Sequence, residues 1–217
     1  PKAFLMDEPL SNLDAQLRQQ TRVEIMTLQR ELNATMLYVT HDQAEAMTMG
    51  DRVAVLNRGV LQQFAPPHEV YDRPQSLFVA TFFGTPRMNT STVQVDGSVA
   101  RLGAGVVPLP ASGTLPDRII LGIRSEDVLL DDSSPIRVRV SRVEMPGAET
   151  FAYTDVQGAE PGTALTIRLA ARAGVAPGDE LGVKFPMERV HLFDPDSGAI
   201  ALESGPSQFG RCRDAFG

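Results

Sequence analysis

Three observations in the sequence predict an α/β unit followed by an all-β unit. Over residues 1–84, short apolar segments alternate with helical patterns, which is typical of β-α-β folds. Beyond this region, short β-rich segments bounded by Gly, Pro, Asp and Ser recur at roughly ten-residue spacing, as in small barrels or sandwiches. The turn-forming run Gly84-Thr85-Pro86 separates the two patterns. We therefore expect one domain at residues 1–84 and another at residues 85–217.

The composition excludes several functional classes. The 217 residues carry a net charge of −7, which argues against nonspecific nucleic-acid binding because that requires a basic face. The single cysteine, Cys212, rules out a disulfide framework within the chain. No apolar run approaches the roughly 20 residues of a membrane span, and we find no signal peptide. Since the chain begins without Met and inside a motif, we expect it to be the C-terminal piece of a longer protein.

The first predicted element is a buried strand at residues 3–6, because this apolar segment shows no alternation. Two adjacent carboxylates, Asp7 and Glu8, follow it directly, and Pro9 prevents a central strand from continuing. Two like charges side by side call for a bound cation, water or a proton between them. The alternative is an acidic strand end that is simply solvated.

A long amphipathic helix is predicted over residues 15–32. Asp14 is well placed as its N-cap, and Asn33 tolerates the left-handed geometry that ends many helices. Its apolar stripe, which we expect to be buried, consists of Leu17, Thr21, Ile25, Leu28 and Leu32.

Residues 35–40 form the second predicted strand. A right-handed crossover through the helix makes it parallel to the first strand. Thr40, His41 and Asp42 then stand at the same edge of the sheet as Asp7 and Glu8, where open α/β sheets bind ligands. A lone histidine is often structural, and this alternative stays open for His41; Asp42 is expected to cap the next helix.

The remaining elements follow in short order. A helix is expected at residues 43–49 and an antiparallel hairpin at residues 53–64, turned by Asn57-Arg58-Gly59. Pro66-Pro67 open another helix, and an apolar helix covers residues 76–83. In the second half, strands are expected at residues 92–95, 119–123, 136–143, 150–156, 163–168, 180–185 and 190–193.

The front segments resemble two motifs of the ATP-binding cassette (ABC) ATPases. Residues 3–14 resemble the Walker B strand and D-loop, and residues 38–47 resemble the switch-histidine segment. The resemblance implies that Asp7 holds Mg²⁺, that Glu8 polarises the attacking water, and that His41 contacts the γ-phosphate of ATP. It also implies a D-loop that reaches across a dimer interface, formed by Ser11, Asn12, Leu13 and Asp14.

Three phrases in the rear half narrow the resemblance: Gly122-Ile123-Arg124-Ser125-Glu126, Gly147-Ala148-Glu149-Thr150 and Val190-His191-Leu192-Phe193-Asp194. They are similar to the regulatory region, built from OB-fold (TOBE-like) barrels, of import ATPases of the maltose and glycerol-phosphate type. Ser125 departs from the proline of many relatives. The implied architecture is the C-terminal part of a P-loop NTPase nucleotide-binding domain followed by an all-β regulatory domain.

The resemblance implies the ATP-hydrolysing subunit of an ABC importer for a sugar or related solute. It implies a homodimer with a second ATPase subunit, membrane permease subunits, regulatory proteins at the rear domain, and a peripheral position on the cytoplasmic face of the inner membrane. The phosphate loop, glutamine loop and signature of the family are absent from the chain. We therefore expect these 217 residues alone neither to bind ATP tightly nor to hydrolyse it.

Three alternatives remain open at this point. The chain resembles ATPases of polyamine and iron importers as well, and the solute cannot be derived from this sequence. A non-transport ABC ATPase is a second option, against which the importer-like rear phrases argue. The third is a non-enzymatic regulatory or dimerisation module whose acidic pair is vestigial.

Overall fold

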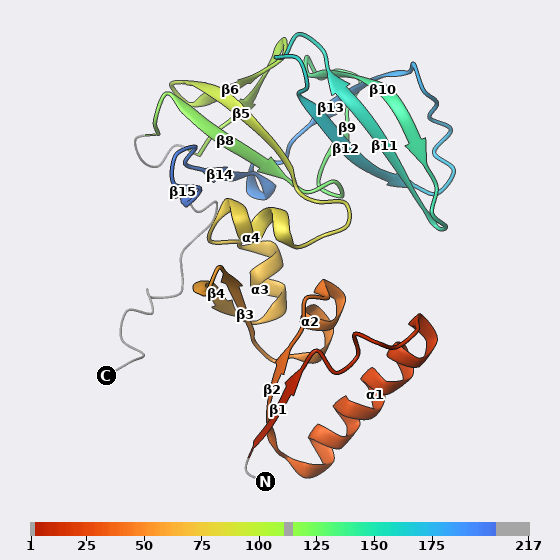
Figure 1. The fold of residues 1–217 in the computed structure, drawn as a ribbon. Coiled ribbons are helices and arrows are strands. Elements are labelled where there is room, and N and C mark those ends of the chain that lie inside the picture. Colours follow the sequence, from red (N-terminus) through yellow and green to blue (C-terminus); the bar gives the residue numbers. More distant parts are fainter. Residues whose placement is uncertain (1–2, 111–114, 203–217) are drawn as a thin grey trace. The chain divides into compact units, whose positions relative to one another are not determined.

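The computed structural model describes residues 3–110 and 115–202. The chain divides into two compact units, Pro1–Gln75 and Ser76–Gly217 (Figure 1). This division places helix α4 (Leu77–Phe82) in the second unit, where Ala80 packs against Met88 and Phe193. The domain limits 1–84 and 85–217 stay a prediction.

The first unit contains the predicted β-α-β element. Strands β1 (Ala3–Asp7) and β2 (Thr35–Val39) pair in parallel, with a register that runs from Ala3 opposite Thr35 to Asp7 opposite Val39. Helix α1 (Ala15–Leu32) makes the crossover between them (Figure 1). The parallel arrangement confirms that Asp7 and the residues after Val39 lie at the same edge of the sheet.

The caps of α1 also confirm the prediction. The Asp14 carboxylate accepts a hydrogen bond from the Leu17 amide at 2.9 Å, and Asn33 ends the helix in the left-handed region with φ 46°.

The predicted burial of β1, β2 and α1 is wrong. The Leu5 side chain of β1 is 79% exposed and that of Leu37 on β2 is 60% exposed. No residue of α1 is buried, and Leu32 at the end of its stripe is 53% exposed. The physical reason is that a two-stranded sheet with one helix has too few neighbouring layers to cover its apolar faces.

The rest of the first unit follows the prediction closely. Helix α2 (Gln43–Met49) precedes an antiparallel hairpin of β3 (Val53–Asn57) and β4 (Val60–Ala65), and helix α3 (Pro67–Asp72) starts at the second proline. Gly59 supplies the positive φ of 79° that the hairpin turn requires.

Over its described residues, the second unit is all-β apart from α4 and a 3₁₀ turn (Met187–Arg189), which confirms the predicted class. Its strands form a six-stranded sheet in the order β15-β14-β8-β5-β6-β7 and a five-stranded sheet in the order β12-β11-β10-β13-β9, with antiparallel pairing. The strands are β5 (Asn89–Asp96), β6 (Val99–Leu102), β7 (Gly105–Pro108), β8 (Arg118–Ile123), β9 (Leu129–Leu130), β10 (Arg137–Glu144), β11 (Glu149–Val156), β12 (Ala164–Ala170), β13 (Glu180–Lys184), β14 (His191–Phe193) and β15 (Ile200–Leu202). Four of them, β6, β7, β9 and β15, were not among the predicted strands.

The core of the second unit draws on both sheets. Ile119 of β8, Val138 of β10 and Ile167 of β12 are fully buried in one cluster. Asn89 of β5 links the sheets by polar contacts, since its side-chain amide donates to the Thr166 carbonyl at 2.9 Å and accepts from the Thr166 amide at 2.7 Å. The side chain of Asn89 thus makes two hydrogen bonds to the backbone of β12, as a neighbouring strand would.

Arg124 joins α4 to the β-strands of the second unit. It is 3% exposed and donates to the Phe83 carbonyl at 2.6 Å, directly after the last turn of α4. A guanidinium is well suited to carbonyls at a helix C-terminus because it offers several donors and a positive charge.

Candidate functional site

The candidate site lies at the carboxyl ends of β1 and β2, where the structure brings together two of the predicted residues. His41 Nδ1 is 2.9 Å from Glu8 Oε1. Both side chains are accessible to solvent, with exposed fractions of 74% for His41 and 44% for Glu8. The two side chains are therefore paired and also open to a ligand.

The backbone at Glu8 is unusual. Its φ of 45° lies in the left-handed region, which residues other than Gly, Asn and Asp seldom adopt. The Glu8 amide still donates to the Val39 carbonyl at 2.8 Å, so the turn begins only after the last sheet bond. Ser11 holds the turn, because both its amide (3.2 Å) and its hydroxyl (2.9 Å) donate to the Glu8 carbonyl. Strained backbone of this kind is concentrated at functional sites.

The turn after Glu8 is anchored from α1. Arg18 donates through Nη2 to the Leu13 carbonyl at 2.9 Å and through Nε to the Leu10 carbonyl at 3.4 Å. Leu10 itself is only 1% exposed. Arg18 was not predicted as a site residue; the available signal was a basic residue in the first turn of the helix that follows the turn.

The other predicted turn residues take different positions. Asn12 lies exposed in the turn, whereas the Asp14 carboxylate accepts the Leu17 amide and so caps α1. Asp14 therefore has a structural partner in this chain, and any contact with a partner or ligand would come in addition.

Asp7 ends β1 and is exposed. Among residues 3–110 and 115–202, no group of three or more His, Cys, Asp or Glu side chains could hold a metal ion. A magnesium ion does not need such a cage, because it keeps several waters and is usually bound by one or two carboxylates together with substrate phosphates. The exposed Asp7 carboxylate fits that kind of site.

The electrostatics of the pair favour a charged His41. The hydrogen bond to Glu8, and next the negative charge of Glu8, raise the pKa of His41 above its ordinary value. Protonated imidazole donates from both ring nitrogens, so that Nε2–H stays available when Nδ1–H is bonded to Glu8.

A buried glutamate bonds to the residues on both sides of His41. Glu45 of α2 is 3% exposed, and its Oε2 accepts from the Thr40 hydroxyl at 2.7 Å and from the Tyr38 hydroxyl at 3.0 Å. Burial, and next the hydrogen bond to Glu45, raise the pKa of Tyr38. The Asp42 carboxylate accepts from the Glu45 amide at 3.0 Å, which confirms the predicted cap of α2. Glu45 was missed, although its spacing from Asp42 is that of a capping box.

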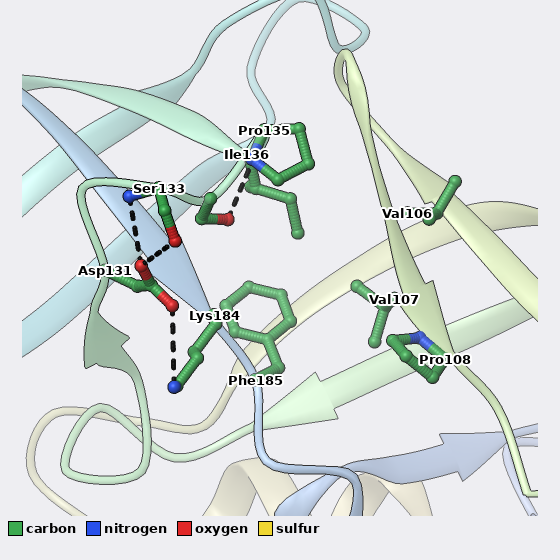
Figure 2. A pocket seen from close by; sticks show the side chains of 10 residues that line it. Val106, Val107, Pro108, Asp131, Ser133, Pro135, Ile136, Lys184 and Phe185 are labelled. Carbon is green, nitrogen blue, oxygen red and sulfur yellow. Dashed lines mark hydrogen bonds and ion pairs between the residues drawn. The ribbon is translucent and has the colours of Figure 1, made fainter.

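The second unit contains a hollow of about 340 Å³ beside β7 and β13 (Figure 2). Its polar groups already bond one another: Asp131 accepts from Ser133 at 2.6 Å and pairs with Lys184 at 3.4 Å. The hydrogen bonds from Ser133 lower the pKa of Asp131. Because the charges in this hollow compensate each other, we assign no ligand to it.

The sequence of the chain is similar to known protein families and proteins. A sequence model of the TOBE domain matches residues 121–193, which run from β8 to β14. The sn-glycerol-3-phosphate import ATP-binding protein UgpC of Ruegeria sp. (strain TM1040) is 43% identical, over 94% of this chain and 57% of that protein. The chain is a homologue of ABC importer ATP-binding subunits.

Two further importer subunits extend the comparison. The xylose/arabinose import ATP-binding protein XacK of Haloferax volcanii is 43% identical, over 100% of this chain and 58% of that protein. The trehalose/maltose import ATP-binding protein MalK of Thermococcus litoralis is 43% identical, over 91% of this chain and 57% of that protein. The predicted resemblance to sugar-type importer subunits is thereby confirmed, and the chain spans a little more than half the length of these relatives.

A weak structural similarity was found to one solved structure. The cytoplasmic molybdate-binding protein ModG aligns with a TM-score of 0.34 at 17% identity, covering 49% of this chain and 94% of ModG. A similarity this weak does not establish a shared fold. Within the described part of this importer-subunit homologue, no helix combines the length and apolar character of a membrane span.

Proposed function

We propose that this chain is part of the ATP-hydrolysing subunit of an ABC importer that energises uptake of a sugar or related solute. The observation that carries the proposal is the 2.9 Å contact between His41 and Glu8 at the end of two parallel strands. The names of the similar proteins, all import ATP-binding proteins, support the transport class.

Glu8 is the proposed catalytic carboxylate. A carboxylate is an acceptor only, so it can take a hydrogen bond from the water that attacks the terminal phosphate of ATP and draw its proton. Phosphoryl transfer depends mainly on positioning and charge stabilisation, and an exposed carboxylate fixed by a strained turn suits that task.

His41 has two proposed tasks in the same step. Its Nδ1–H holds the Glu8 carboxylate in place, and its Nε2–H can bond an oxygen of the terminal phosphate. The positive charge that Glu8 favours on His41 is of the right sign for a phosphate oxygen.

Asp7 would hold Mg²⁺ at the end of β1. The positive charge of a bound Mg²⁺ would offset the negative charge of the ATP phosphates. Ser11, Asn12 and Asp14 belong to the turn that we assign to contacts with a second ATPase subunit. In that assignment residues 1–84 are the C-terminal part of a P-loop NTPase nucleotide-binding domain, and residues 85–217 are the regulatory OB-type domain.

The chain contains no Gly-x-x-x-x-Gly-Lys-Ser/Thr sequence. We assign the binding of the ATP phosphates by such a loop to residues outside these 217. In this proposal, membrane permease subunits couple ATP hydrolysis to transport of the solute. Contact with those subunits would hold the protein at the cytoplasmic face of the membrane.

The test is Glu8→Gln in the complete protein. Gln keeps the shape of the side chain but cannot take up a proton, so we expect Mg·ATP affinity to stay within about 2-fold and turnover to fall about 100-fold or more. Glu31→Gln, an exposed carboxylate of α1, is the matched control. Hydrolysis at the wild-type rate in Glu8→Gln would remove Glu8 from the proposed role.

A further inference from the structure

We propose that Thr40 and Glu45 are positioning residues, which hold the backbone on both sides of His41 so that its imidazole meets Glu8. This inference rests on the proposed function, because it concerns the same site. The supporting observation is a closed set of hydrogen bonds among Thr40, Asp42 and Glu45.

The first step is the buried carboxylate of Glu45. A carboxylate that is only 3% exposed needs donors, because burial without them costs several kcal/mol. Two hydroxyls of one strand end supply them: Tyr38, at 3.0 Å, and Thr40, at 2.7 Å. The position of Glu45 is therefore fixed relative to β2.

The second step is that these bonds form a closed ring through Thr40, Asp42 and Glu45, which includes the residues before and after His41. The Thr40 hydroxyl donates to Glu45 and at the same time accepts from the Asp42 amide at 3.0 Å. The Asp42 carboxylate in turn accepts from the Glu45 amide at 3.0 Å. Both chain neighbours of His41 are thus tied to the same buried residue.

The third step is energetic. An exposed ion pair is worth little by itself, because ordering two mobile side chains offsets most of its attraction in water. His41 is 74% exposed, yet it lies in hydrogen-bond contact with Glu8. The contact is favoured when the His41 backbone is already fixed, and the ring through Thr40 and Glu45 supplies that fixation.

The test is an NMR measurement on the 217-residue chain. The readouts are the ring-to-side-chain nuclear Overhauser contact between His41 and Glu8 and the change in the His41 pKa caused by Glu8→Gln. Both are recorded in the wild-type background and in Thr40→Val, which removes the hydroxyl and leaves every charge in place. His68 and His191 serve as internal references.

In Thr40→Val we expect the Overhauser contact to be lost and the His41 pKa to fall toward its ordinary value of 6.5, with no further change on adding Glu8→Gln. Thr40→Ser, which keeps the hydroxyl, is expected to retain both signals. Tyr38→Phe is the matched control, because it removes the other donor to Glu45 without touching the ring, and the pair should survive it.

Persistence of the contact and of the Glu8-dependent shift in Thr40→Val would overturn the positioning role while leaving the proposed function intact. If Tyr38→Phe and Thr40→Val lose the Overhauser contact and the pKa shift equally, the positioning role is also overturned. The ring would then only support the fold in general. If Glu8→Gln leaves the His41 pKa unchanged in the wild-type background, there is no pair to position, and the proposed function loses its main observation as well. Glu45→Gln, read by the Overhauser contact, is the second variant should Thr40→Val fail to fold.

Discussion

Glu8 and His41 define the site at the scale of single residues. Their meeting follows from parallel strand ends, which the sequence pattern predicts. The hydrogen bonds that hold the neighbouring chain segments could not be predicted from the sequence pattern. Arg18 bonds to backbone carbonyls and Glu45 accepts from hydroxyls, and only the fold brings these partners near.

The raised pKa of His41 leads to a prediction on pH. Since Glu8 favours protonated His41, the pair contributes stability that is fully present below the unfolded-state pKa and is lost as pH rises through the higher folded-state value. In an NMR titration we expect Glu8→Gln to lower the His41 pKa toward 6.5.

Glu31→Gln, on the exposed surface of α1, is the control for that titration and should leave His41 unchanged. A His41 pKa at its ordinary value in the wild-type chain would contradict the contact seen in the structure.

Asp14 allows a separation of structural from functional roles. Asp14→Ala removes the N-cap of α1 and should lower the free energy of unfolding by about 1 kcal/mol, whereas Asn caps nearly as well and Asp14→Asn should cost only a small fraction of that. Urea unfolding, together with amide exchange in the first turn of α1, measures both. An equal loss in the two variants would show that the charge, and not the cap, is what the position requires.

At the scale of elements, the helix and strand assignments of the first unit were predicted well because they depend on local signals. The caps at Asp14 and Asn33 and the hairpin turn at Gly59 are examples. Burial was predicted badly for the same unit, since it depends on neighbours that a local pattern does not contain. Leu5 and Leu37 have the character of core residues and yet are exposed.

In the second unit, the side chain of Asn89 replaces a strand pairing. Asn89→Ala leaves the amide and the carbonyl of Thr166 without their partner, and we expect it to lower the free energy of unfolding by about 2 kcal/mol. Thr92→Ala, at an exposed position of the same strand, should change it by less than about 0.5 kcal/mol.

Asn89→Asp refines this prediction. The carboxylate can still accept from the Thr166 amide but cannot donate to the carbonyl, so its cost should resemble that of the alanine variant rather than that of Thr92→Ala. Thermal unfolding followed at the second unit measures the series. Asn89→Ala at wild-type stability would show that the link between β5 and β12 is dispensable.

At the scale of the whole molecule, the sequence predicts the two classes of architecture in the correct order. It misses short strands such as β9 and β15, because two or three residues carry too little periodicity. The boundary that the sequence predicts at Gly84 stays a prediction, and in the structure α4 packs with the second unit through Ala80 and through the hydrogen bond from Arg124 to the Phe83 carbonyl. Contacts between a helix and a distant strand leave no local signal in the sequence.

We propose that Glu8 and His41 act as one catalytic pair, and a double-mutant cycle on ATP turnover by the complete protein tests this proposal. Residues that act as a unit lose activity together, so Glu8→Gln with His41→Ala should be no slower than the worse single variant, within about 3-fold. If the two losses multiply instead, the residues act independently, and the account of the site given by their 2.9 Å contact is wrong.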